Sequence, residues 1–198
     1  MGILDFLRGR KTQSVSTPPK PTVSTPVVKT PVPSQEPQSE DHGVVLHNVK
    51  RSSTWGAFKN KFLKDHPACE ACGKTDAVQV HHVFPFDYAI NLGFPSLEEW
   101  APNLITLCET ESGKPEENHH LALGHLMNFK CANLNVRQDV ITYRGQTLEQ
   151  IQESSNYQRE EKDRLPAFED LTEQEKTDAI AWIKAHYPDL PEFQKTGS

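Results

Sequence analysis

The cysteine pair in Cys69-Glu-Ala-Cys72-Gly73 constrains this chain more than any other short segment. Two thiols separated by two residues can bind one metal ion from a single turn, and a following glycine suits a tight knuckle. Cys108 offers a third thiolate further along the chain. The many nearby histidines favour a zinc site over two disulfides. Zinc thiolates fit a reducing compartment, so we expect a cytoplasmic protein.

A closed structural zinc site needs a fourth ligand. The alternatives are His119 and Cys131, and we expect His119 because it lies at the start of a predicted helix that faces the same corner. Cys131 is expected to be a small buried hydrophobic residue. The sequence therefore predicts a structural zinc site formed by Cys69, Cys72, Cys108 and His119.

Five histidines lie between positions 81 and 125, close to these cysteines in the sequence. His81 and His82 are adjacent in a predicted strand, and adjacent strand residues point to opposite faces. We therefore expect that they cannot both be core residues. One of them can bind a metal ion while the other takes a proton from water, because neutral imidazole suits both roles near pH 7.

Hydrophobic periodicity predicts a small α+β domain over residues 44–137. Apolar residues at three- and four-residue spacing predict an amphipathic helix that ends before Pro67. Valines around the double histidine predict a strand, and a short apolar run at 103–108 predicts a second strand or a turn. The segment 113–129 opens with Gly, Pro and acidic residues, as the start of a helix does.

The flanking regions differ from this domain in composition. Hydrophobic residues make up only 35% of the chain, so part of it is expected not to pack. Residues 1–10 are either a frayed terminus or a short amphipathic peptide that docks to a protein or a membrane surface. Residues 11–42 are rich in Pro, Ser and Thr and are expected to be a disordered linker. Residues 138–198 form an acidic helical extension, with an exposed charged helix over 148–164 and another that opens with a capping box at Thr172.

The charge distribution limits how this chain can bind nucleic acid. The net charge is −6, and residues 138–198 hold thirteen acidic against seven basic side chains. A field of that sign repels DNA, so contact with phosphates would need metal ions and local basic residues. The candidates for these contacts are Lys59, Lys61, Lys64, Lys74 and Lys130. No apolar run approaches the length of a transmembrane helix, and we expect neither a transmembrane segment nor a secretion signal.

Four stretches, in this order, resemble the HNH endonuclease family in its zinc-containing form: RSSTWGAFKNKFLKDHPACEACG, VQVHHVFPF, APNLITLCE and NHHLALGHLMNF. They lie between about Arg51 and Val136 and cover under half of the chain. The resemblance implies a ββα-metal fold, in which a hairpin, a loop and a helix hold one divalent ion. It also implies an endonuclease that hydrolyses phosphodiester bonds in a DNA substrate.

The same resemblance suggests a role for each residue of the motif. His82 resembles the general base that activates water, and His81 resembles a ligand of the catalytic metal ion. Asn103 resembles the central asparagine, which braces the loop and the base and in some members touches the metal. The remaining ligand corresponds to His120 or His125. These two are five positions apart, about 140° around an ideal helix, so both can bind one ion only if the helix is distorted or only its end is used, and they are treated as alternatives.

The chain departs from the family at His119, where members usually have cysteine. Zinc readily accepts three cysteines and one histidine. Histidine and asparagine ligands with open water positions suit Mg²⁺, Mn²⁺ or Ni²⁺ as the catalytic ion. The alternative is a catalytically inactive, zinc-bound HNH-fold module that binds DNA or protein. The acidic charge and His119 favour this alternative, whereas the intact set of His81, His82 and Asn103 favours a nuclease.

Overall fold

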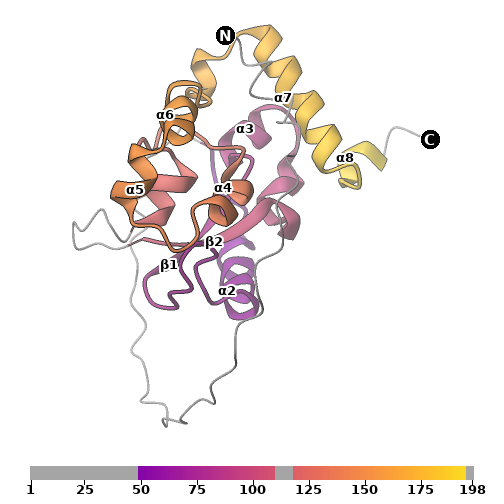
Figure 1. Cartoon of the computed structure of the whole chain (residues 1–198). Coiled ribbons are helices and arrows are strands. Elements are labelled where there is room, and N and C mark those ends of the chain that lie inside the picture. The colour runs from indigo at the N-terminus through magenta and orange to yellow at the C-terminus, as the bar shows by residue number, and fades with distance from the viewer. Residues whose placement is uncertain (1–48, 110–117, 195–198) are drawn as a thin grey trace.

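The computed structural model describes residues 49–109 and 118–194 (Figure 1). The predicted peptide 1–10, the predicted linker 11–42 and the predicted helix start at 113 lie outside the described residues. Within these residues, helices combine with one two-stranded antiparallel sheet, which confirms the α+β class. In this part of the chain, every helix is too short or too polar to cross a membrane.

The elements that the structure describes include α-helices, single turns of other helix types (η) and two strands. In chain order they are α2 (Trp55–Asp65), β1 (Val78–His82), α3 (Phe86–Asn91), η1 (Pro95–Glu99), η2 (Ala101–Asn103), β2 (Leu104–Cys108), η4 (His120–Gly124), α4 (Val136–Thr142), α5 (Leu148–Glu153), α6 (Ser155–Lys162), η5 (Phe168–Asp170), α7 (Glu173–His186) and α8 (Pro191–Gln194).

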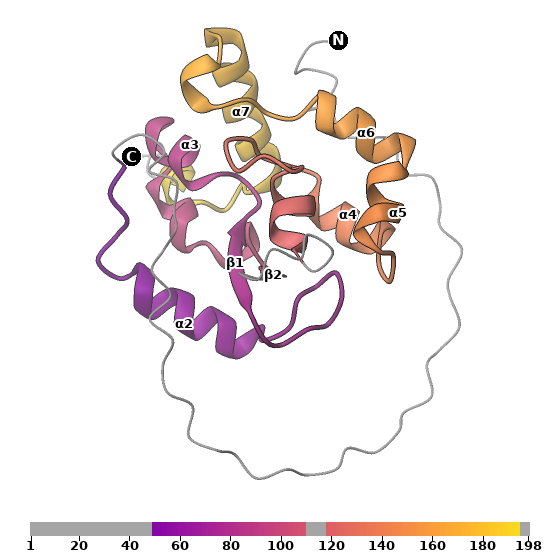
Figure 2. The same cartoon turned by 90° about the vertical axis from the view of Figure 1, so that its left-hand side faces the viewer.

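The two strands form the centre of the fold, and both of their faces are covered. β1 pairs with β2 so that Val78 lies opposite Cys108 and His82 lies opposite Leu104. Figure 2 shows α2 on one side of this hairpin and α4 on the other. His81 and His82 therefore point to opposite faces and are still both buried, with 4% and 8% of their surface exposed. The expectation that they cannot both be core residues is wrong, because helices cover the two faces.

The acidic C-terminal helices pack onto the same core as the hairpin. One cluster of buried side chains runs from Cys69 to Leu190 and includes Leu107 of β2, Ile151 of α5 and Ile183 of α7. Figure 1 shows α7 lying beside α3, at the end of the molecule away from α2. Trp182 of α7 stacks on Phe84, so α7 supports the loop between β1 and β2.

The C-terminal region shows one difference from the predicted helices and one agreement. The predicted exposed helix over 148–164 breaks at Ser154, whose extended backbone ends α5 and begins α6. Tyr157 of this region is buried in the core, so the segment is not a purely solvated one. The predicted capping box is confirmed, because Thr172 and Glu175 exchange side-chain and backbone hydrogen bonds at the start of α7.

Candidate metal centres

Three cysteines and one histidine bring their ligand atoms within 4.8 Å of one another: Cys69, Cys72, Cys108 and His119. Sγ of Cys72 lies 3.8 Å from Sγ of Cys108, and Nδ1 of His119 lies 3.1 Å and 3.9 Å from Sγ of Cys108 and Cys69. A tetrahedral zinc ion sets sulfur–sulfur edges of about 3.8 Å and sulfur–nitrogen edges of about 3.5 Å. The cysteines are free thiols, and the cluster has the donor set and spacing of a zinc site.

The knuckle and β2 hold these thiols in place. The backbone N–H of Gly73 donates to the carbonyl of Cys69 at 2.7 Å, and the N–H of Cys69 donates to Lys74 at 2.7 Å. Gly73 has a φ of 77°, a left-handed conformation that glycine adopts without steric cost. The N–H of Glu70 donates to the carbonyl of Thr106 at 3.0 Å and joins the knuckle to β2. Local turn chemistry therefore sets the ligand positions.

The thiols of this cluster compete for protons. A hydrogen bond from Cys108 lowers the pKa of Cys69 to about 3, while burial acts in the opposite direction. The same hydrogen bond and burial raise the pKa of Cys108 far above its usual range. The pair therefore holds one proton, and a bound cation would favour the loss of that proton too. Cys131, the alternative fourth ligand, lies outside this cluster and is half-buried.

Three histidines form a second cluster: His81 of β1, His120 of η4 and His125 directly after η4. Their ring centroids lie 5.1, 4.9 and 4.9 Å apart, so they form a nearly equilateral triangle. One ion about 2.1 Å from a nitrogen of each ring would place the centroids about 5 Å apart. The three rings therefore fit around a single ion.

The chemistry of His81 also points to a cation. Nε2 of His81 is buried and has no hydrogen-bond partner among the described residues. An unpaired buried nitrogen costs about 1–3 kcal/mol, which a metal–nitrogen bond would offset. Burial, and then the neighbouring His125 and His120, lower the pKa of His81 well below its ordinary value. The ring is therefore neutral at pH 7, the form that binds a metal ion.

The type of helix at η4 explains why both His120 and His125 belong to this cluster. Residues His120–Gly124 form a π-helix, whose i→i+5 hydrogen bonds bring residues five apart onto one face. The α-helix predicted here would have separated the two histidines. Leu126 and Met127 follow with φ values of 47° and 62°, a strain of about 1–3 kcal/mol each that often occurs at functional sites.

Hydrogen bonds set which ring nitrogen of each histidine is available. Nδ1 of His120 donates to Oε2 of Glu109 at 2.9 Å, and Nδ1 of His125 donates to the carbonyl of Cys131 at 2.9 Å. Carbonyls and carboxylates only accept, so Nδ1 carries the hydrogen in both rings and Nε2 keeps its lone pair. This is the usual way in which metal-binding histidines are oriented.

Two residues that contact the three-histidine cluster, Glu109 and Gly124, were not identified as site residues from the sequence. Glu109 contacts His120, and Gly124 lies directly against His81: an ideal Cβ at Gly124 would lie 2.8 Å from Cε1 of that ring. Glu109 directly follows Cys108, and Gly124 directly precedes His125. Their positions beside expected ligands were the only signal in the sequence.

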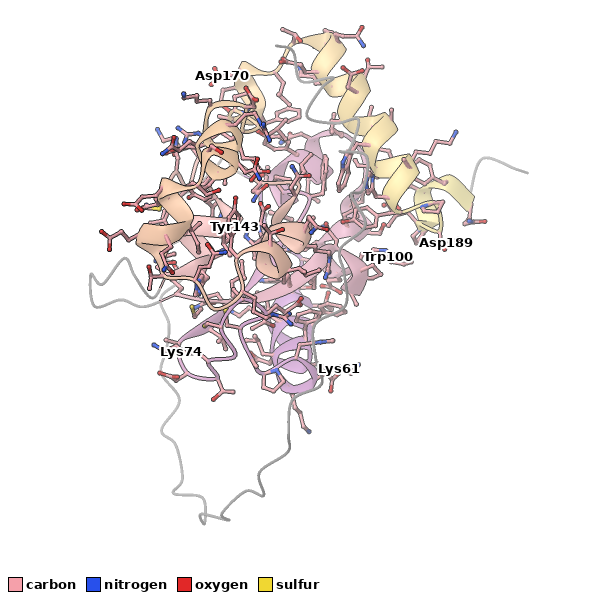
Figure 3. All side chains as sticks on the ribbon, in the orientation of Figure 1. Lys61, Lys74, Trp100, Tyr143, Asp170 and Asp189 are labelled. Carbon is pink, nitrogen blue, oxygen red and sulfur yellow. The ribbon has the colours of Figure 1, made fainter. Side chains whose placement is uncertain are left out.

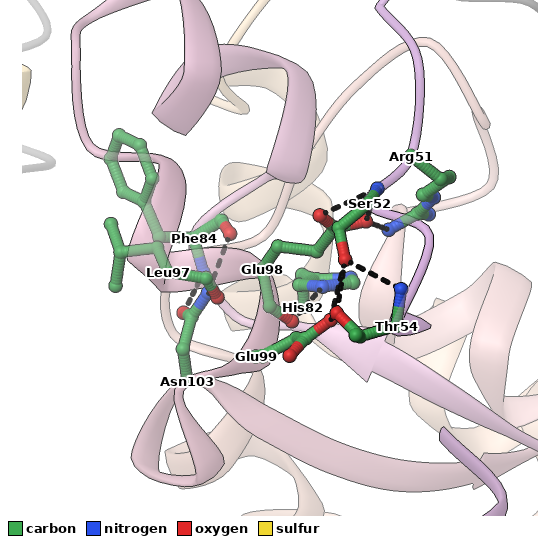
Figure 4. A network of polar contacts seen from close by, with 9 residues as sticks. All are labelled: Arg51, Ser52, Thr54, His82, Phe84, Leu97, Glu98, Glu99 and Asn103. Carbon is green, nitrogen blue, oxygen red and sulfur yellow. Dashed lines mark hydrogen bonds and ion pairs between the residues drawn. The ribbon is translucent and has the colours of Figure 1, made fainter. Parts of the chain in front are cut away.

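His82 lies on the other face of β1, under α2. Its ring centroid lies 4.9 Å from that of Trp55 and 6.1 Å from that of Phe86. Nε2 of His82 donates to the carbonyl of Glu98 at 3.0 Å, so the lone pair is on Nδ1 (Figure 4). Burial, and then the charge of Arg51, lower the pKa of His82 to about 3. His82 is therefore neutral and held in one tautomer.

Asn103 is fully buried and braces the loop between β1 and β2. Its Oδ1 accepts from the backbone N–H of Phe84 at 2.7 Å and from the hydroxyl of Tyr187 at 3.0 Å. Its Nδ2 donates to the carbonyls of Phe84 and Leu97 at 3.0 and 3.1 Å, as Figure 4 shows. The side-chain amide of Asn103 is therefore hydrogen-bonded to the loop and to Tyr187, which directly follows α7. Asn103 belongs to neither ligand cluster.

Comparisons of the chain with protein-family models, curated proteins and solved structures give no match. The likeness to HNH endonucleases therefore depends on the residues quoted above. The structure itself adds a Cys3His cluster typical of zinc and a neighbouring cluster of three histidines.

Proposed function

We propose that this protein is a metal-dependent HNH endonuclease that hydrolyses phosphodiester bonds in DNA. The three-histidine cluster beside the Cys3His cluster is the observation that supports this proposal. A zinc ion held by four protein ligands is closed to substrate, whereas an ion held by three histidines keeps open positions for water and a phosphate oxygen. The order of β1, loop, β2 and η4 is the order of parts that the ββα-metal fold implies.

Hydrolysis of a phosphodiester needs an activated water and a neutralised phosphate. An ion held by His81, His120 and His125 would stabilise the negative charge that develops on the phosphate and the leaving oxygen. In the proposed mechanism His82 takes the proton from the attacking water, which its neutral ring and free Nδ1 lone pair allow. A DNA phosphate close to His82 would raise the proton affinity of the ring.

The donor set narrows the choice of catalytic ion. Imidazole nitrogens suit Ni²⁺ and Mn²⁺ better than Mg²⁺, which prefers oxygen ligands and keeps its waters. Asn103 adds no oxygen, because its amide is already engaged with the loop. We therefore expect activity with Ni²⁺ or Mn²⁺ to exceed activity with Mg²⁺, and we expect Zn²⁺ in the Cys3His cluster.

The charges of the described residues support an approach of DNA at the α2 end. Figure 3 shows Lys61 and Lys74 at the end formed by α2 and the knuckle, whereas Asp170 and Asp189 lie toward α7. Lys59 and Lys64 are also on α2. An acidic chain can thus present local basic side chains close to the hairpin, which is what phosphate contacts require.

The alternative is a zinc-bound module that has kept the fold and binds DNA or protein without cutting. The observation that favours it is the closed position of His82, which is 8% exposed and has one ring nitrogen already hydrogen-bonded. A module that does not cut DNA needs no phosphate beside His82, so α2 could keep covering this ring. The Cys3His cluster would then serve only to stabilise the fold.

A plasmid assay with matched histidine variants separates the two. The zinc-loaded protein should convert supercoiled DNA to nicked or linear forms with Ni²⁺ or Mn²⁺. Substitution of His81 by alanine should abolish cutting. Substitution of His82 by alanine should lower the rate by about 10²–10⁴-fold and leave metal binding intact. His186, exposed at the end of α7 and away from α2, provides the control, and His186→Ala should cut normally.

A contaminating nuclease would survive the His81→Ala substitution, so persistence of cutting in that variant would count against the proposal. An intact, zinc-loaded wild-type protein that leaves both DNA and RNA uncut with every divalent ion would favour the binding module.

A further inference from the structure

We infer that Glu109 is a positioning residue whose carboxylate orients the ring of His120, so that Nε2 faces the ion of the three-histidine cluster. This inference depends on the proposed metal centre. It is based on the 2.9 Å hydrogen bond from Nδ1 of His120 to Oε2 of Glu109.

The backbone places Glu109 for this contact. Glu109 directly follows Cys108 at the end of β2, and its N–H donates to the carbonyl of Ala77 at 2.7 Å. His120 directly follows His119 in the same way. Two successive contacts therefore join the same two segments: Cys108 with His119 at 3.1 Å, and Glu109 with His120 at 2.9 Å. The carboxylate is thus anchored at the sheet end next to the zinc-type cluster.

The surroundings distinguish this pair from an ordinary surface ion pair. The side chain of His120 is 15% exposed and that of Glu109 is 31% exposed. A charged acceptor on Nδ1 fixes the tautomer of a metal-binding histidine and makes its other nitrogen a better donor to the metal. His125 has only a neutral carbonyl in the equivalent place, that of Cys131. Glu109 therefore places a carboxylate beside the three-histidine cluster, where His125 has only a carbonyl.

Ni²⁺ binding to the full, zinc-loaded chain tests the inference by isothermal titration calorimetry. Loss of such a contact typically weakens metal affinity by about 10–100-fold, which we expect for Glu109→Ala. Glu109→Gln keeps an acceptor oxygen but loses the charge, so its affinity should lie between those of wild type and Glu109→Ala. The matched control is Glu99→Gln, because Glu99 accepts hydrogen bonds from Ser52 and Thr54, away from both clusters. Its Ni²⁺ affinity should equal that of wild type.

Long-range ¹H–¹⁵N spectra of the histidine rings provide a second measurement that does not depend on activity. His120 should carry its hydrogen on Nδ1 in wild type and in Glu109→Gln, and should become a mixture of tautomers in Glu109→Ala. A role limited to joining two segments would lower the Tm without changing the affinity or the tautomer of the folded protein. If Glu109→Ala fails to fold, the Ni²⁺ affinity of Glu109→Gln is compared with that of wild type, and a lower affinity of Glu109→Gln supports the inference.

Two outcomes would overturn the inference in different ways. Ni²⁺ affinity of both Glu109 variants within twofold of wild type, together with loss of binding in His120→Ala, would leave the metal centre standing and remove the role of Glu109. Unchanged Ni²⁺ affinity in His120→Ala would remove the three-histidine centre, and with it the proposed function.

Discussion

Replacement of Gly124 by alanine is expected to displace the ring of His81 and weaken the three-histidine cluster. An added Cβ would lie 2.8 Å from Cε1, 2.9 Å from Nδ1 and 3.2 Å from Nε2 of that ring. Carbon atoms pack at about 3.5–4.0 Å, so the ring would have to move by about 0.7 Å or more. His81 is 4% exposed, which leaves it little free space for such a movement.

The expected change in stability is the balance of two effects. A methyl group forced into a packed site costs about 1–3 kcal/mol. Removal of a glycine from a helical segment returns about 0.5–1 kcal/mol. Gly124 does not have a positive φ, so alanine adds no backbone strain there. We therefore expect the free energy of unfolding to fall by about 0.5–2 kcal/mol and the Ni²⁺ affinity to fall by at least about tenfold.

Gly56 provides the matched control, because it lies within α2 and an added Cβ would meet nothing within 4 Å. Gly56→Ala should therefore raise the free energy of unfolding by about 0.5–1 kcal/mol, the opposite sign. Urea unfolding of the zinc-loaded proteins measures both changes, and calorimetric titration with Ni²⁺ measures the affinity. If Gly124→Ala is stabilised as much as Gly56→Ala and binds Ni²⁺ like wild type, Gly124 does not support His81 as described.

Two further predictions concern the zinc-type cluster and the braced loop. Elemental analysis should find one tightly bound zinc per chain; Cys69→Ser should lose it and Cys131→Ser should keep it, and equal zinc content in both variants would contradict the ligand set. Tyr187→Phe should lower the free energy of unfolding by about 1 kcal/mol, because it removes the hydrogen bond to Oδ1 of Asn103. Asn103→Ala leaves buried groups of Phe84 and Leu97 unpaired and should cost about 3 kcal/mol or more. Additive losses in the Tyr187→Phe/Asn103→Ala double variant would argue against a direct bond.

Much of the fold and part of the site follow from local patterns in the sequence. The helix before Pro67, the strand around the double histidine and the capping box at Thr172 each depend on residues that are neighbours in the chain. The grouping of His119 with the three cysteines also followed from spacing and from the expected start of a helix. Short-range geometry was sufficient in these cases.

The other features depend on contacts between distant segments. Alternation in a strand places His81 and His82 on opposite faces, but it cannot show that α2 covers one face and η4 borders the other. The π-helix at His120–Gly124 is not visible in a pattern of apolar residues, because the expected periodicity is that of an α-helix. In the sequence Glu109 looks like any surface acid, and its contact with His120 appears only when β2 and η4 meet.

The residues that support the loop between β1 and β2 lie far later in the chain, and this affects when the loop can become ordered during synthesis. Asn103 is bonded to Tyr187, 84 positions later, and the N–H of Ser96 donates to Oε1 of Glu192, 96 positions later, at 3.0 Å. A ribosome releases a chain from the N-terminal side first. Every residue of both clusters has emerged by His125, before the residues that support the loop whose Glu98 carbonyl accepts the hydrogen bond of His82. The loop between β1 and β2 would therefore gain its last supports only after the C-terminal residues Tyr187 and Glu192 are released.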